Sequence, residues 1–164
     1  MKSRADFESS VFLHLGKLIV ANGIPKETAI KTEVIDLLNP QNICEPLEDF
    51  PKYFTGTVGG SVGNNLIISG GCCDYSDEIY IYSNSGFTKV GNLLEPRESA
   101  SSISLDDSIL WIIGGSNRYG ALNSTEFIQV QGSEVIVTEG PILPSHIMYH
   151  CTVKINETVS MLIG

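Results

Sequence analysis

Ile109-Leu-Trp-Ile-Ile-Gly-Gly115 is an apolar run closed by two glycines, and runs of this kind recur along the chain. The related runs are Lys17-Leu-Ile-Val-Ala-Asn-Gly23, Leu66-Ile-Ile-Ser-Gly-Gly71 and Val159-Ser-Met-Leu-Ile-Gly164. Gly23, Gly71 and Gly115 are 48 and 44 residues apart. Because a fixed period in this range is the sequence signature of a repeat architecture, we expect the chain to be built from similar units.

Two further landmarks repeat with a common offset. Strand-like runs with alternating apolar residues begin at Thr32, Asp77 and Thr125, which are 45 and 48 residues apart. The same two spacings separate Pro51, Pro96 and Pro144. Within the strand-like runs the equivalent acidic residues are Glu33, Glu78 and Glu126. Because a residue that returns in every unit is better explained by architecture than by one active site, we interpret these glutamates as a repeated hydrogen bond or turn constraint.

A segment rich in small or β-branched residues precedes each apolar run, and a short turn joins the two. The turns contain the Asn, Asp and Gly residues that a tight hairpin requires. Each unit therefore holds four short strands, and the apolar one is expected to be buried on both faces near a shared axis. We place the units at 17–62, 66–105 and 109–155, with flanking strands over 7–13 and 159–164. The predicted fold class is all-β, and four-stranded units of about 45 residues indicate propeller blades.

The chain resembles the kelch family in several of these residues. The glycine doublet stands at Gly70-Gly71 and Gly114-Gly115, with Asn22-Gly23 as a degraded copy, and the family's Pro-Arg pair stands at Pro96-Arg97. Counted from the glycines, Ile147 takes the arginine place of the third unit, and His150 takes the histidine place that follows it. The resemblance implies a kelch-type β-propeller, here about three blades of a larger ring. The family's usual tryptophan in the third strand is missing, so individual ligand-binding residues are not carried over.

Composition narrows the functions that fit the chain. The net charge is −9, from 19 acidic and 10 basic residues, and no basic cluster is present, so we expect no nucleic-acid partner. No apolar run approaches the roughly 20 residues of a membrane-spanning helix. The segment 11–21 could serve as the apolar core of a signal peptide, but His14 and Lys17 interrupt it, and the same segment is explained by two strands.

The cysteines leave the compartment open. Cys44, Cys72, Cys73 and Cys151 match no zinc-binding spacing, and we interpret them as small buried side chains in a reducing compartment. Asn123 and Asn156 begin glycosylation sequons, which would suit an extracellular protein with a disulfide. We favour a cytoplasmic location and keep the extracellular one as the alternative.

No motif carries a catalytic, metal or cofactor prediction. His146 and His150 have the spacing of metal ligands on a helix, but here they precede and enter a strand. The acidic segment 72–78 lacks the ligand alternation of a calcium loop. The glycine-rich segment 58–63 lacks the Lys-Ser/Thr of a phosphate-binding loop. We therefore predict a protein that is not an enzyme and needs no cofactor.

The variable segments 24–31, 72–76 and 116–124 all link first to second strands, so they should emerge on one face of the disc. On that face Tyr75, Arg118 and Tyr119 are the residue types that anchor protein interfaces, and we predict that they contact a partner. The resemblance implies a protein-binding module, such as a ubiquitin-ligase adaptor or an actin-associated scaffold. Two alternatives remain, a secreted or cell-surface adhesive protein and a propeller enzyme of the sugar oxidase or epimerase type.

Overall fold

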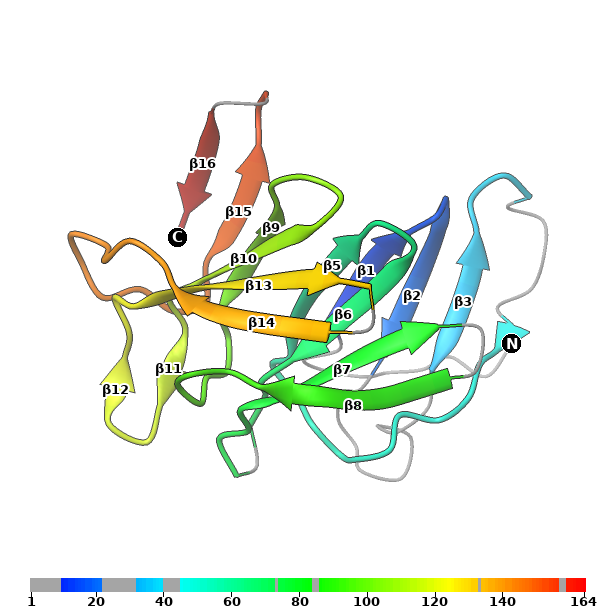
Figure 1. The fold of residues 1–164 in the computed structure, drawn as a ribbon, viewed down its shortest axis with the longest axis horizontal. Coiled ribbons are helices and arrows are strands. Elements are labelled where there is room, and N and C mark those ends of the chain that lie inside the picture. Colours follow the sequence, from blue (N-terminus) through cyan, green and yellow to red (C-terminus); the bar gives the residue numbers. More distant parts are fainter. Residues whose placement is uncertain are drawn as a thin grey trace.

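The protein is an all-β structure. A computed structural model describes residues 10–21, 32–39, 45–72, 74–83, 86–132, 134–156 and 159–164, and every regular element in them is a β-strand (Figure 1). No helix in these residues is long and apolar enough to cross a membrane. The predicted fold class is therefore confirmed at the level of its secondary structure.

Twelve of the strands form three antiparallel sheets of four, in which each strand pairs with the next strand of its own sheet. The first sheet contains β1 (Ser10–His14), β2 (Lys17–Ala21), β3 (Glu33–Asp36) and β4 (Glu45–Pro46). The second contains β5 (Val58–Val62), β6 (Asn65–Ser69), β7 (Glu78–Ser83) and β8 (Gly86–Asn92). The third contains β9 (Ser101–Ser104), β10 (Ile109–Ile113), β13 (Thr125–Gln131) and β14 (Glu134–Glu139).

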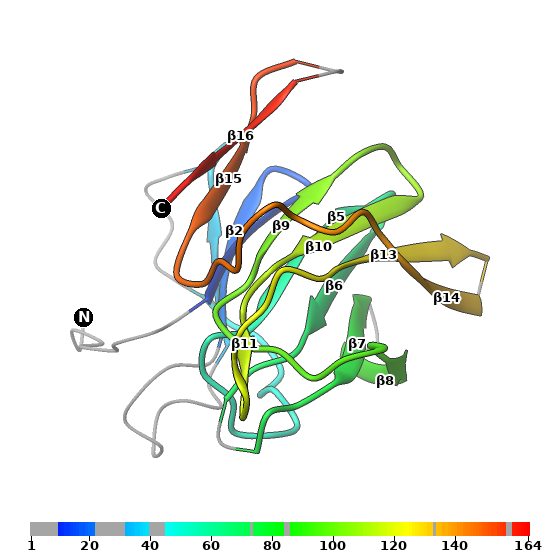
Figure 2. The ribbon, with the colours of Figure 1, turned by 90° about the vertical axis from the view of Figure 1, so that its left-hand side faces the viewer.

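Two strand pairs complete the fold. The hairpin of β11 (Ser116–Asn117) and β12 (Gly120–Ala121) is inserted between β10 and β13. At the C-terminal end, β15 (Cys151–Lys154) pairs only with β16 (Ser160–Ile163) among the described residues. Figures 1 and 2 show this last pair standing out from the body of the molecule.

The sheets begin one strand earlier than the predicted units. The units 17–62, 66–105 and 109–155 each end with a strand that pairs with the apolar run of the following unit, as Val62 does with Asn65. The reason is the turn at Gly63, whose φ of 56° closes a hairpin between β5 and β6. A spacing pattern gives the same repeat whichever strand is counted first, so it could not place this boundary.

The apolar runs were predicted to lie nearest to the neighbouring units, but other strands occupy that place in the structure. β1, β5, β9 and β15 contact one another in this order, whereas the apolar runs β2, β6 and β10 stand one place further out in their sheets. The predicted burial of an apolar run on both faces is nevertheless confirmed for β6. Its Leu66 and Ile68 pack into the core between the first and second sheets, and its Ile67 packs into the core between the second and third.

Inner strands approach one another closely because their facing residues are small. A Cβ added to Gly60 would lie 2.8 Å from Leu110 Cδ1, which shows how near β5 lies to the third sheet. Hydroxyls bridge the strands at equivalent places, since Ser61 Oγ donates to the carbonyl of Leu13 and Ser104 Oγ to that of Ser61. The glycine-rich segment 58–63 is thus largely strand β5 and serves inter-sheet packing.

Candidate functional site

One face of the protein collects the long connections. β5 and β7 run away from this face and β6 and β8 return to it, because each pairs antiparallel with the next. The connections at 70–77, 93–100, 114–124 and 140–150 therefore lie at the same end of the sheets, and we call this end the loop face. The predicted clustering of 72–76 and 116–124 is confirmed for the residues that the structure describes, whereas 24–31 lies outside them.

A short hairpin presents two of the predicted contact residues on the loop face. Arg118 and Tyr119 form the tip between β11 and β12, and Tyr119 is 81% exposed. The Asn117 side chain fixes the tip, because its Oδ1 accepts from the Tyr119 N–H at 2.8 Å and its Nδ2 donates to Glu95 at 2.9 Å. The Arg118 guanidinium lies 4.7 Å from the centre of the Tyr119 ring. The tip is therefore held in place by hydrogen bonds within the loop face.

The three predicted contact residues share one cavity. Tyr75 comes from the connection between β6 and β7, and it lines a cavity of about 640 Å³ together with Arg118 and Tyr119. We call this the outer cavity, and its other lining residues are Asp74, Leu94, Glu95, Pro96 and Asn117. Tyr75 adopts a φ of 49°, a backbone conformation that is uncommon for a tyrosine. Such positions concentrate at binding and switch sites.

Charge in the outer cavity is distributed unevenly. Glu95 is held by Asn117 and by Ser124, whose hydroxyl donates to it at 2.6 Å. Asp74 and Arg118 are exposed at the opening. The walls are thus aromatic and apolar at Tyr75, Leu94, Pro96 and Tyr119, with one exposed acid and one exposed base. This composition matches the centre of a protein interface more closely than a phosphate or metal site.

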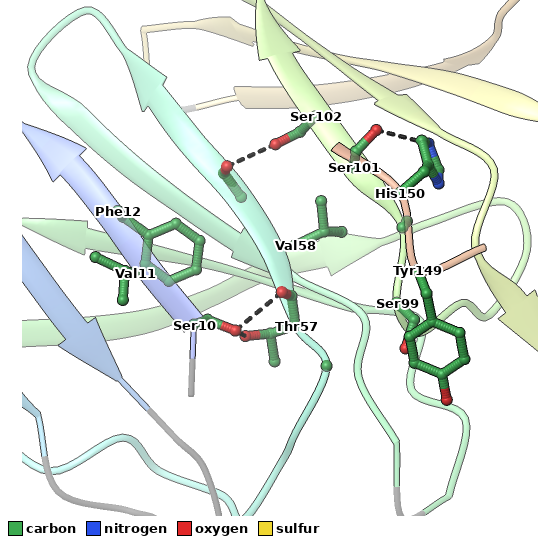
Figure 3. A pocket seen from close by; sticks show the side chains of 13 residues that line it. Ser10, Val11, Phe12, Thr57, Val58, Ser99, Ser101, Ser102, Tyr149 and His150 are labelled. Atoms are coloured by element: carbon green, nitrogen blue, oxygen red, sulfur yellow. Dashed lines mark hydrogen bonds between the residues drawn. The ribbon is translucent and has the colours of Figure 1, made fainter. Parts of the chain in front are cut away.

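A second cavity lies where the inner strands begin. It has a volume of about 350 Å³ and is lined by the first residues of β1, β5 and β9 and by the residues before β15 (Figure 3). We call it the axial cavity. Gly56, Ser99 and Tyr149 all have positive φ at its rim, and their backbones are linked, since Ser99 N donates to Gly56 O and Tyr149 N to Ser99 O. Sequence reasoning missed this site because single serines carry no recognisable signal.

The Ser101–His150 pair of the axial cavity is a bond between sheets. Ser101 Oγ lies 2.7 Å from His150 Nε2, and burial lowers the pKa of the histidine. At the boundary between β1 and β5, Ser10 Oγ contacts Thr57 Oγ1 at 2.6 Å in the equivalent place. A contact that occurs at two separate boundaries is better explained by sheet packing than by nucleophilic catalysis. His146 is exposed, and no cluster of three metal-binding side chains occurs in the described residues.

The glycine doublets of the repeat signature bind the connection that leads from their own sheet into the following strands. Gly71 N donates to Arg97 O and Gly115 N to Ile147 O, both at 2.8 Å, so Ile147 takes the place of Arg97 as predicted. Gly70 and Gly114 have φ values of 67° and 57°. A Cβ added to Gly70 would collide with the Arg97 carbonyl oxygen, and one added to Gly114 would lie 2.6 Å from the Ile147 carbonyl oxygen. Glycine is therefore required here both by backbone conformation and by space.

Glu126 and Glu78 both accept hydrogen bonds, but from different kinds of partner. Glu126 accepts from the N–H groups of Leu94 and Glu95 and from the Arg97 guanidinium. Glu78 accepts from Lys52, Lys89 and Tyr80. Glu33 is the first residue of β3 and pairs with Val20 of β2.

The remaining predicted residues are dispersed over the molecule. Asn123 lies on the loop face, and Asn156 lies at the β15–β16 connection, at the opposite end of the sheets. The predicted burial of the cysteines is wrong for Cys151, which is exposed at the start of β15, whereas Cys72 is half-buried with its Sγ 2.5 Å from Thr55 Oγ1. Gly23, Cys44 and Cys73 lie outside the described residues.

Comparison with known proteins gives a fold and no family. No family model matches the chain, and no curated protein matches it. Among solved structures 156 chains are similar, one of them the structure of YjhT, with a TM-score of 0.71 and 21% sequence identity. The match covers 81% of this chain and 45% of that one, so the chain spans less than half of YjhT. At this identity the similarity establishes the fold alone.

Proposed function

We propose that this chain is part of a kelch-type β-propeller that binds another protein through its loop face. The kelch assignment is supported by the successive four-stranded antiparallel sheets and by the glycine doublets that receive the carbonyls of Arg97 and Ile147. Inner strands that contact one another in chain order are the arrangement expected around a propeller axis.

The observation that carries the binding proposal is the convergence of Tyr75, Arg118 and Tyr119 on the outer cavity. Two separate connections supply them, and the Asn117 hydrogen bonds hold the Arg118–Tyr119 tip in place. Tyrosine and arginine supply much of the binding energy at protein interfaces, and a rigid tip loses little conformational entropy when it binds. A partner segment that inserts between Tyr75 and Tyr119 would bury both rings.

The proposal is tested by selecting binders from a displayed random-peptide library on the immobilised chain. Affinities of the selected peptides are then measured for the wild type and for Tyr119→Ala and Arg118→Ala. Because truncation of an interface anchor typically costs tenfold or more in affinity, we expect the main peptide families to weaken by at least about tenfold.

Matched controls come from the opposite end of the sheets. Lys17→Ala removes an exposed positive charge near the β1–β2 turn, and Leu38→Ala removes a side chain that is 90% exposed after β3. Both controls should bind like the wild type. If the selected peptides bind Tyr119→Ala and Arg118→Ala unchanged, the outer cavity is not the recognition site and the proposal fails.

A further inference from the structure

Two successive units carry a tyrosine at the same place, and the residue before it has opposite charge in the two units. Tyr75 follows the second glycine of its doublet by four residues, and Tyr119 does the same in the next unit. Asp74 precedes the first tyrosine, and Arg118 precedes the second. All four side chains line the outer cavity. Its two sides therefore offer the same aromatic group with opposite charges.

Both charged groups are available to a partner. Asp74 and Arg118 are exposed, and within the described part of the chain neither forms an ion pair, with the other or with a third residue. The Arg118 guanidinium contacts the Tyr119 ring, which leaves its N–H groups free to bind a carboxylate. Glu95, by contrast, already accepts hydrogen bonds from two neighbouring side chains. The charges of the outer cavity that await a counter-charge are thus those beside the two tyrosines.

A third cavity, of about 590 Å³, adjoins the outer cavity, because Asp74 and Tyr75 line both. We call it the acidic cavity. Apart from tyrosines, its ionisable lining residues are Lys52, Asp74, Asp77 and Glu78. The lysine pairs with the glutamate, and Asp77 accepts from the neutral Asn92 side chain. The carboxylates of Asp74 and Asp77 therefore give this side of the loop face an excess of negative charge.

We infer that the outer cavity and the acidic cavity bind an extended segment of another protein that carries a basic and an acidic residue on either side of an apolar one. The inference rests on the proposed function and names the chemistry of its partner. The basic side chain pairs with Asp74 and lies over the Tyr75 ring, since a cation is attracted by a carboxylate and by an aromatic face. The acidic side chain accepts hydrogen bonds from Arg118. The apolar residue packs between them against Leu94, which is 55% exposed.

Opposite charges on the two sides of the outer cavity select both the composition and the direction of the segment. A uniformly basic segment would bring a cation beside Arg118, and a uniformly acidic one would bring a carboxylate beside Asp74. Like charges placed together at an interface suppress binding strongly. A segment of mixed charge, bound in one direction, satisfies both sides.

The charge pattern is tested by selection from a displayed random-peptide library on the wild type and on the charge-reversed variants Asp74→Lys and Arg118→Glu. Wild-type selection should yield peptides with a basic and an acidic residue flanking an apolar one. On Asp74→Lys an acidic residue should replace the basic one, and on Arg118→Glu a basic residue should replace the acidic one. Labelled wild-type peptides, titrated in fluorescence anisotropy, should bind each variant at least about fivefold more weakly.

Matched controls reverse charges at the opposite end of the sheets. Asp107→Lys and Lys17→Glu change the net charge by the same amounts, and both residues are exposed. Since exposed charges further apart than roughly 8 Å are largely screened at physiological salt, both controls should select the wild-type pattern and bind the wild-type peptides with unchanged affinity. They separate local pairing from an effect of the net charge of −9.

Failure of this inference differs from failure of the proposed function. If the wild-type peptides lose affinity for Tyr119→Ala but bind either charge-reversed variant as tightly as the wild type, the outer cavity remains the binding site and the charge pattern is wrong. Wild-type selection of uniformly charged peptides would overturn the pattern as well. If Tyr119→Ala and both reversals leave binding unchanged, the proposed function fails and this inference fails with it. Since selection on each variant must recover peptides of the altered pattern, an unfolded variant could not imitate the expected result.

Discussion

The guanidinium of Arg97 and the carboxylate of Glu126 form a buried ion pair that joins the connection at 93–100 to the third sheet. Their side chains are 0% and 2% exposed, and Nη2 lies 2.5 Å from Oε1. Nη1 also donates to the carbonyls of Gly114 and Ser124. Charges removed from water are tolerated only when they are paired and bonded in this way.

Glu126→Gln should destabilise the protein strongly, because it leaves the Arg97 charge buried without a counter-charge. Removing one partner of a buried ion pair typically costs about 3–5 kcal/mol. Urea denaturation measures the free energy of unfolding for the variant and the wild type. Lys89→Ala is the control, since Lys89 is 45% exposed in its pair with Glu78 and should cost about 1 kcal/mol or less. Equal costs for the two variants would contradict the assigned role of the buried pair.

Sequence reasoning succeeded where a feature repeats and failed where residues far apart in the sequence had to be paired. The glycines at 70, 71, 114 and 115 have fixed spacings and a conformation that only glycine adopts readily, so they revealed the repeat. The pairing of Arg97 with Glu126 spans 29 residues, and no local pattern marks it. Unit boundaries were misplaced for a different reason, because the units were counted from the apolar runs even though hairpin turns such as the one at Gly63 join each run to the strand before it.

The candidate site shows the same division. Tyr75, Arg118 and Tyr119 were predicted to share a face because antiparallel strands return their connections to the same end, and that reasoning needs no distances. The axial cavity was missed because Ser10, Ser101 and Ser102 become a site only when three strands lie side by side.

Gly114→Ala should destabilise the protein by more than a positive φ alone explains. Its φ is 57°, and its added Cβ would lie 2.6 Å from the Ile147 carbonyl oxygen. Left-handed strain of about 1–2 kcal/mol combines with a comparable overpacking cost, so we expect a total of about 2–4 kcal/mol in urea denaturation.

Gly132→Ala separates the two contributions to that cost. Gly132 has a φ of 63°, but nothing lies within 4 Å of its added Cβ. It should therefore show the strain of about 1–2 kcal/mol without the collision. The collision at Gly114 would be disproved by equal free energies of unfolding for the two alanine variants.

Glu78 should make the stability of the protein fall in acid. Burial acts to raise the pKa of this carboxyl, but hydrogen bonds from Lys52, Lys89 and Tyr80 outweigh it and lower the pKa to about 2. The unfolded chain therefore binds a proton first, and the stabilisation is complete above the ordinary carboxyl pKa of about 4.3 and is lost as the pH falls toward 2. Melting temperatures of the wild type between pH 6 and pH 3, about the span of that titration, should fall more steeply than those of Glu78→Gln.

Protonation of His14 and His150 should weaken the boundaries between sheets. His14 Nδ1 lies 2.8 Å from Ser61 Oγ, and because that hydroxyl donates to Leu13 O, the histidine must be the donor. Burial lowers the pKa of both histidines below the ordinary value of 6.5. The unfolded chain therefore takes up protons first as the pH falls below 6.5, and stability decreases in that window.

His14→Gln and His150→Gln remove a titrating group each, so the double variant should show a flatter dependence of melting temperature on pH between about 7 and 5. Because Glu78 titrates at lower pH, a double variant as steep as the wild type in this window would show that the two histidines do not destabilise the boundaries when charged.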